Sequence, residues 1–385
     1  MDQEITVIDA DGHIMEPSNL WKEWIDPKFR DNCIHVIRDK KDGDKFIVDG
    51  VPSVKIRRLG GIAPPLNKNT VNWNFLELAS YIPYMESLLE ASYIPEKRLT
   101  WMDEQSICES WLFPSLGLIW PQETKADDEY VYKHMVAYNR WIHNFCLVNS
   151  DRLIPVGQTY IFPDHDNVAQ LELLSEMDFR HIMLPVCRTG SCFANGYKRF
   201  WSAVNEHQFI VHMHKAAIPN FLNIEIGTRV GAYGTGLFFS HVNDILPGIM
   251  CLVGLLDSLI PEKYPKIRFT VLECNAGWVP SWLERMDESY EILKTNGRCN
   301  MIRKPSEVIL QSDRFLFGIG FEENLSPLSE ITDKLVIATD FPHPDCPIDS
   351  IAQWRFLLDE LPEGDRSAIL GSNARRFSTQ HFNEK

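Results

Sequence analysis

The sequence lacks the excess of basic residues that nucleic-acid-binding proteins carry. Its 385 residues include 38 Lys and Arg against 53 Asp and Glu, for a formal net charge of −15 at pH 7. The two signs are mixed along the chain, so we expect no basic face that attracts polyanions. This balance argues against a nucleic acid or an anionic membrane surface as partner.

Long apolar runs are also absent. The most apolar late stretch, residues 245–260, contains Pro247 and Asp257. It is shorter than the roughly 20 residues that cross a bilayer as a helix. We therefore expect a buried helix there and no membrane partner. The acidic residues 1–4 run directly into a predicted strand, so we expect no secretory signal either.

Cysteine pairs with CxxC spacing are missing as well. The nine cysteines are scattered, and Cys146, Cys251 and Cys274 lie inside apolar segments. An odd number of core-like cysteines is typical of free thiols in a reducing compartment, not of a disulfide scaffold. We therefore expect a cytoplasmic protein.

The sequence does contain a regular alternation of short apolar segments and amphipathic ones. Eight segments have the length and composition of buried strands: 8–13, 107–113, 153–160, 181–186, 209–214, 267–273, 315–319 and 335–340. Helical patterns separate most of them, which predicts parallel βα units and a (β/α)8 TIM barrel. We expect one barrel over residues 1–385, with an insertion at about 17–75 after the first strand. This insertion includes a predicted β-hairpin over 34–56.

The first strand ends in an Asp-x-His pair. Asp11 and His13 are two residues apart, and side chains alternate faces along a strand, so both project to the same side. A carboxylate and an imidazole in this arrangement can hold one divalent metal ion. The competing interpretation is a strand end whose aspartate caps the following turn.

Three later strands also end in ionisable residues. His212 and His214 end the fifth strand, Glu273 the sixth and Asp340 the eighth. The active site of a (β/α)8 barrel lies at the carboxyl ends of its strands, so these side chains would meet at one rim. Ionisable groups there are costly unless they are paired or metal-bound. Together they predict a metal site.

At this point the chain resembles a known family, the amidohydrolase-related metal-dependent hydrolases. It is similar to the branch that contains aminocarboxymuconate-semialdehyde decarboxylase and the resorcylate-type decarboxylases. The matching stretches are IDADGHIMEP at 8–17, YNRW at 138–141, FIVHMH at 209–214, KIRFTVLECNAGWVP at 266–280, ATDFPHPD at 338–345 and LGSNARRF at 370–377. The resemblance implies a barrel fold, a divalent metal ion (Zn, Mn or Fe) and a small-molecule substrate.

The resemblance also implies roles for single residues. Asp11 and His13 match the family's first ligand pair, and His212 matches the strand-five ligand, with His214 as the rival or a second ligand. Asp340 matches the aspartate that binds metal and handles protons.

One departure concerns the residues after strand six. The decarboxylases have a catalytic histidine there, whereas this chain has Glu273, Cys274 and Asn275. His241 is an alternative source of an imidazole. His343 is expected either to face the substrate or support a ligand, or to pack in its loop. Trp278 is expected either to line an apolar substrate wall or to pack in the core.

Two uses of these residues stay open. With one ion, the site would hydrolyse a C–N or C–O bond or catalyse a non-oxidative decarboxylation through metal-activated water, with Asp340 or His241 moving protons. With two ions bridged by Glu273, and with His212 or His214 and His241 as ligands of the second, it would be a dinuclear Fe or Fe/Mn oxygenase. A third interpretation is a non-catalytic partner subunit of an active paralogue. We expect a homo-oligomer or a complex with such a paralogue.

Overall fold

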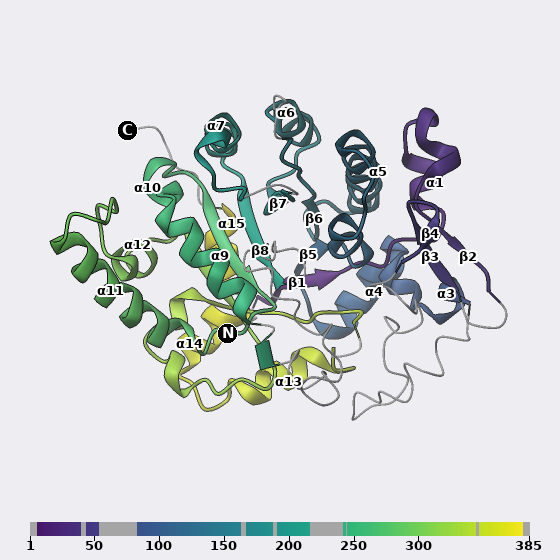
Figure 1. Cartoon of the computed structure of the whole chain (residues 1–385). Coiled ribbons are helices and arrows are strands. Elements are labelled where there is room, and N and C mark those ends of the chain that lie inside the picture. The colour runs from purple at the N-terminus through teal and green to yellow at the C-terminus, as the bar shows by residue number, and fades with distance from the viewer. Residues whose placement is uncertain are drawn as a thin grey trace, which may run out of the picture.

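Eight parallel strands form a barrel (Figure 1). The computed structural model describes residues 6–39, 44–53, 83–162, 167–187, 191–215, 242–243, 245–343 and 346–379. The strands of the barrel are β1 (Ile8–His13), β5 (Glu109–Phe113), β6 (Leu153–Gly157), β7 (His181–Met183), β8 (Ile210–His214), β9 (Arg268–Leu272), β10 (Phe315–Ile319) and β11 (Leu335–Ile337). Neighbours pair in this order, and every pair is parallel. The predicted (β/α)8 barrel is confirmed.

The barrel closes where β1 meets the segment that follows β11. The backbone N–H of Asp340 donates to the carbonyl of Asp11 at 2.9 Å, and the N–H of His13 donates to the carbonyl of Phe341 at 2.7 Å. Both bonds lie at the carboxyl ends of their strands. The polar ends of the first and last strands are therefore held side by side.

Helices cover the outside of the barrel (Figure 1). They are α1 (Leu20–Trp24), α3 (Tyr84–Ser87), α4 (Pro95–Gln105), α5 (Asp128–Cys146), α6 (Ala169–Glu176), α7 (Lys198–Glu206), α9 (Leu246–Asp257), α10 (Ile260–Lys263), α11 (Val279–Thr295), α12 (Pro305–Leu310), α13 (Ser350–Leu357), α14 (Glu363–Ser367) and α15 (Asn373–Thr379). Among the described residues, no helix is long and apolar enough to cross a membrane. The nine cysteines are all free thiols.

The insertion after β1 contains a small antiparallel sheet. The predicted hairpin is present as β2 (His35–Ile37) and β3 (Lys45–Val48), and a third strand, β4 (Val51–Pro52), pairs with β3. The rest of the predicted insertion, from residue 54 onward, lies outside the described residues, as does the turn at 40–43.

One extra residue in β1 determines which of its side chains point into the barrel. Residues 9–12 of β1 pair with residues 110–112 of β5, so three steps along one strand match two along the other. Such a β-bulge shifts the alternation of faces. As a result Asp9 and Gly12 point outward to α4, whereas Asp11 and His13 point to the interior rim.

Candidate metal centre

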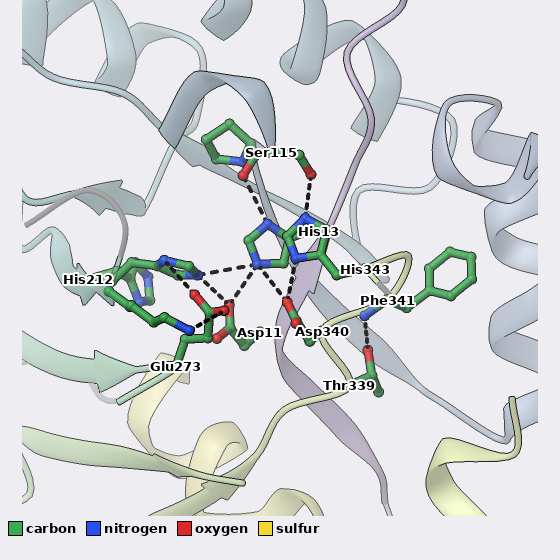
Figure 2. A network of polar contacts seen from close by, with 12 residues as sticks. Asp11, His13, Ser115, His212, Glu273, Thr339, Asp340, Phe341 and His343 are labelled. Carbon is green, nitrogen blue, oxygen red and sulfur yellow. Dashed lines mark hydrogen bonds and ion pairs between the residues drawn. The ribbon is translucent and has the colours of Figure 1, made fainter. Parts of the chain in front are cut away.

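The side chains of Asp11, His13 and Asp340 lie close together at the carboxyl end of the barrel (Figure 2), and His214 lies beside the first two of them. His13 Nε2 lies 3.2 Å from Asp340 Oδ1, 3.2 Å from His214 Nε2 and 3.6 Å from Asp11 Oδ1. Asp11 Oδ1 is also 3.3 Å from His214 Nε2. Asp11, His13 and His214 are fully buried. His13 Nε2 thus lies within 3.6 Å of one further imidazole nitrogen and two carboxylate oxygens, and His13 joins two groups of possible metal ligands, Asp11/His13/His214 and His13/Asp340/His343.

The Nδ1 atoms of His13 and His214 each face an oxygen acceptor on the side away from the cluster. His13 Nδ1 is 2.9 Å from the carbonyl oxygen of Pro114, which can only accept a hydrogen bond, so this nitrogen carries the proton. His214 Nδ1 faces Glu273 Oε2 at 3.6 Å, just beyond hydrogen-bond length. An acceptor beside Nδ1 leaves the Nε2 lone pair available for a metal ion, the usual arrangement of ligating histidines.

The burial of Asp11 supports a cation at this point. Neither of its carboxylate oxygens accepts a hydrogen bond within the part of the chain that the structure describes. A buried carboxylate without hydrogen bonds is costly unless a positive charge lies beside it. The nitrogen and oxygen donors fit a divalent ion such as Zn²⁺, Mn²⁺ or Fe²⁺.

The pKa values of His13 and His214 are shifted in opposite directions. Burial, together with the neighbouring His343 and His214, lowers the pKa of His13 well below its usual value. Burial also disfavours the charged form of His214, but the nearby carboxylates of Asp11 and Glu273 outweigh it and raise its pKa. The carboxylates beside His214 thus favour a positive charge at this point, which a bound metal ion would supply.

Asp340 connects this cluster to a second imidazole. Its Oδ1 lies 2.8 Å from His343 Nδ1, and His343 Nε2 lies 2.9 Å from Ser115 Oγ. The His343 ring packs on the His13 ring, with centroids 4.1 Å apart. His343 thus bonds directly to a residue that faces the metal position, and Ser115 holds its far side.

The backbone at two of these strand ends is strained. Asp340 has φ 55° and Glu273 has φ 53°, in the left-handed region that side chains with a Cβ rarely adopt. Such conformations cost of order 1–3 kcal/mol each and cluster at functional sites. Their occurrence at two rim carboxylates supports a functional role for this end of the barrel.

His212 lies one layer deeper than the sequence suggested. Its Nδ1 is 2.7 Å from Thr270 Oγ1 and its Nε2 is 3.0 Å from His181 Nδ1, so both nitrogens are engaged inside the barrel. His212 precedes His214 by two residues on β8, which corresponds to roughly 6.6 Å along the strand. Of the two histidines on this strand, His214 is the one that lies beside Asp11 and His13.

Two other predicted residues are His241 and Trp278. His241 lies outside the described residues. The indole N–H of Trp278 donates to the carbonyls of Cys274 and Asn275, both at 2.9 Å, and its ring packs edge-on against Phe317. The polar edge of Trp278 is therefore used within its own loop.

The sequence patterns did not reveal the carboxylates that hold the rim loops. Glu16 accepts hydrogen bonds from the backbone N–H groups of Leu116 and Gly117, at 2.9 and 2.8 Å. Glu323 does the same for the loop after β9, where it accepts from the N–H groups of Ala276 and Gly277. Ser115 lies just after β5, the second strand of the barrel. The search for polar residues at the carboxyl ends of strands would therefore have included it if applied to this strand.

Comparison with known proteins places the chain in a family. A family model described as amidohydrolase matches residues 94–377, which is well over half of the chain. The chain therefore belongs to the amidohydrolase family. No curated protein sequence matched it.

Solved structures share the fold at low sequence identity. An amidohydrolase from Mycobacterium avium subsp. paratuberculosis K-10 superimposes with a TM-score of 0.77 at 16% identity, covering 98% of this chain and 100% of that one. The 2,6-dihydroxybenzoate decarboxylase from Rhizobium gives 0.63 at 15% identity, with 97% and 99% covered. A manganese-bound 5-carboxyvanillate decarboxylase from Novosphingobium aromaticivorans gives 0.66 at 14% identity, with 98% of each chain covered.

Proposed function

We propose that this chain is a metal-dependent hydrolase that cleaves a C–N or C–O bond of a small organic substrate. One divalent ion would be held by Asp11, His13, His214 and Asp340. The observation that carries the proposal is the gathering of His214 Nε2, Asp11 Oδ1 and Asp340 Oδ1 at 3.2–3.6 Å from His13 Nε2, with the carboxylate of Asp11 buried and without hydrogen bonds among the described residues. When bound, such an ion acts as a Lewis acid and lowers the pKa of water.

The remaining groups supply the proton chemistry. Asp340 faces the ion position through the same Oδ1 that lies 2.8 Å from His343 Nδ1. Asp340 Oδ1 would accept the proton that leaves the attacking water. His343 Nδ1 would then take this proton from Asp340, and either residue could deliver it to the leaving group. Ser115 keeps the His343 ring in place through its Nε2. This division resembles the general base and its orienting partners in other hydrolytic sites.

Glu273 supports hydrolysis with one ion. It occupies the position where the resembling decarboxylases carry a proton-donating histidine, and it pairs with Lys215 at 3.4 Å. Its carboxylate lies on the Nδ1 edge of His214, whereas Asp11 lies on the Nε2 edge. It is therefore placed to orient a ligand and not to bridge a second ion to the first.

Decarboxylation is the second candidate. Two of the superimposed structures are decarboxylases of hydroxylated aromatic acids, and in both cases the superposition covers at least 97% of each chain. In that reaction the ion would hold the substrate carboxylate, and His343, which bonds to Asp340, would supply an imidazole for protonating carbon.

A metal analysis combined with an anaerobic substrate screen tests the proposal. Protein produced with zinc, manganese and iron supplied should hold about one ion per chain. It should hydrolyse at least one member of a panel of amides, esters and lactones without O2. Asp340→Asn should abolish this activity, whereas Asp359→Asn should not, because Asp359 is an exposed residue that pairs with Arg366 on the surface.

Other outcomes would contradict the proposal in distinct ways. Release of CO2 from hydroxybenzoates, with no hydrolysis, would identify a decarboxylase. Two ions per chain and substrate-dependent O2 uptake would identify a dinuclear oxygenase and return His241 and Glu273 to the ligand set. Absence of any bound metal after mild purification would leave the partner-subunit interpretation.

A further inference from the structure

A buried charged pair lies directly behind the end of β1. Asp9 and Arg98 of α4 are both fully buried, with no exposed surface. The hydroxyl of Ser110 joins them, since it donates to Asp9 Oδ2 at 2.8 Å and accepts from an Arg98 Nη at 3.4 Å. Burying two charges is expensive and needs nearly ideal partners. The pair is therefore a feature that requires an explanation beyond packing.

Asp9 connects β1 to the residue before Asp340. Its Oδ1 accepts from the backbone N–H of Thr339 at 2.9 Å, and its Oδ2 accepts from the Thr339 hydroxyl at 2.9 Å. The same hydroxyl oxygen accepts from the backbone N–H of Phe341 at 3.2 Å (Figure 2). The residues on both sides of Asp340 are thus tied, directly or through one hydroxyl, to the Asp9 carboxylate.

Arg98 contacts His13 and Phe341 from the same side of β1. Its guanidinium donates to the carbonyl of His13 at 2.8 Å. It also lies over the rings of Trp101 and Phe341, at 5.0 and 4.7 Å from their centroids. One side chain of α4 therefore contacts the backbone of a candidate ligand on β1 and the residue that follows the candidate ligand after β11.

Gly12 shows how tightly this support fits. A Cβ atom at position 12 would lie within 3 Å of the side chains of Asp9, Ser110 and Arg98. Real Cβ atoms essentially never approach other atoms so closely, and the neighbours here are buried. The residue between Asp11 and His13 has no side chain because the charged pair fills that space.

We infer that Asp9 and Arg98 are positioning residues for the metal centre. They face away from the ion position, on the outer side of β1, and set the distance between the Asp11/His13 pair and Asp340. The β1 bulge is what gives Asp9 this role, because regular alternation would place Asp9 on the same face as Asp11. The inference rests on the metal site proposed above.

Glu109, a buried carboxylate paired with the exposed Arg375 at the opposite end of the barrel, provides a control. Glu109 at the start of β5 is buried, accepts from Trp111 Nε1 at 2.9 Å, and pairs with Arg375 at 2.8 Å. It resembles Asp9 in burial and in its number of charged partners. It lies at the amino end of its strand, away from the ligand rim.

The test compares metal affinity, coordination geometry and stability in Asp9→Asn and Glu109→Gln. Calorimetric titration with Co²⁺ gives the affinity, the visible absorption spectrum of the cobalt protein reports the coordination, and urea unfolding gives the stability. We expect Asp9→Asn to weaken Co²⁺ binding about 10- to 100-fold, as loss of groups behind metal ligands does elsewhere, and to change the spectrum. Glu109→Gln should lose stability but keep the wild-type affinity and spectrum.

A second variant keeps the test valid if Asp9→Asn does not fold. Thr339→Val keeps the shape and both charges but removes the hydroxyl between Asp9 and Phe341, so it should weaken Co²⁺ binding in the same direction. Wild-type affinity and spectrum in a folded Asp9→Asn or Thr339→Val protein would overturn the inference and leave the pair a purely structural one. Failure of the wild-type protein to bind Co²⁺ would instead overturn the proposed function.

Discussion

Replacing His214 and His212 in turn gives the sharpest prediction from the structure. The two histidines are two residues apart on β8 and both are fully buried. Only His214 has an Nε2 atom beside Asp11 and His13, at 3.3 and 3.2 Å. His214→Gln should therefore remove a metal ligand, whereas His212→Gln should remove only hydrogen bonds to Thr270 and His181.

The expected loss of metal affinity in His214→Gln follows from the number of proposed metal ligands. Loss of a group that merely orients a ligand costs 10- to 100-fold in metal affinity, so loss of one of four ligands should cost at least about 100-fold, or about 2.8 kcal/mol. His212→Gln should lower the free energy of unfolding by about 1–3 kcal/mol, as buried polar groups lose partners, with metal affinity within about threefold of wild type.

The assay is calorimetric titration of Mn²⁺ or Zn²⁺ into metal-free protein, with urea unfolding of the same samples. The opposite pattern, in which His212→Gln loses the metal and His214→Gln keeps it, would refute the assignment of the strand-five ligand. Equal losses in both variants would show that affinity follows stability and not ligation.

Three further predictions concern groups around this site. Glu273→Gln should weaken metal binding about 10- to 100-fold while one ion per chain remains, because Glu273 faces the His214 Nδ1 edge; a drop from two ions to one would contradict the one-ion site. Ser115→Ala should lower kcat about tenfold with KM and metal affinity unchanged, because it frees His343 Nε2; steady-state kinetics on a substrate from the screen would show an effect on KM if Ser115 instead shaped the pocket. Burial raises the pKa of Glu16 to about 7 from 4.5, so its contribution to stability is fully present below pH 4.5 and declines by about 3 kcal/mol as the pH rises through 7. Urea unfolding at pH 5 and pH 8 should show this decline in the wild type and lose it in Glu16→Gln, and identical pH dependence in both proteins would contradict it.

The fold was predictable because its signal is repeated eight times. Each strand is a short apolar run with its own flanking turns, and the parallel barrel follows from their alternation with helices. The rim carboxylates and imidazoles were predictable for a related reason. The carboxyl ends of parallel strands share one edge, so Asp11, His13 and Asp340 had to be neighbours once the barrel was assumed.

The depth of a side chain within the barrel was not predictable in the same way. His212 and His214 share one face of β8, and a period of two residues cannot tell which of them reaches the rim. The β1 bulge was also invisible, because an extra residue in one strand is defined by its pairing partner and not by local composition. Regular alternation would put Asp9 on the same face as Asp11, whereas in the structure it points to α4.

The closure of the barrel between β1 and β11 has a consequence for the order of events during synthesis. Asp11 and His13 are made near the start of the chain, and Asp340 more than 300 residues later. The ion position therefore does not exist on a nascent chain until nearly all of the barrel has been translated and the first and last strands have met. Contacts of such long sequence separation form slowly. Metal binding at the proposed site would then follow completed folding, and an ion bound earlier by single histidines would have to be released.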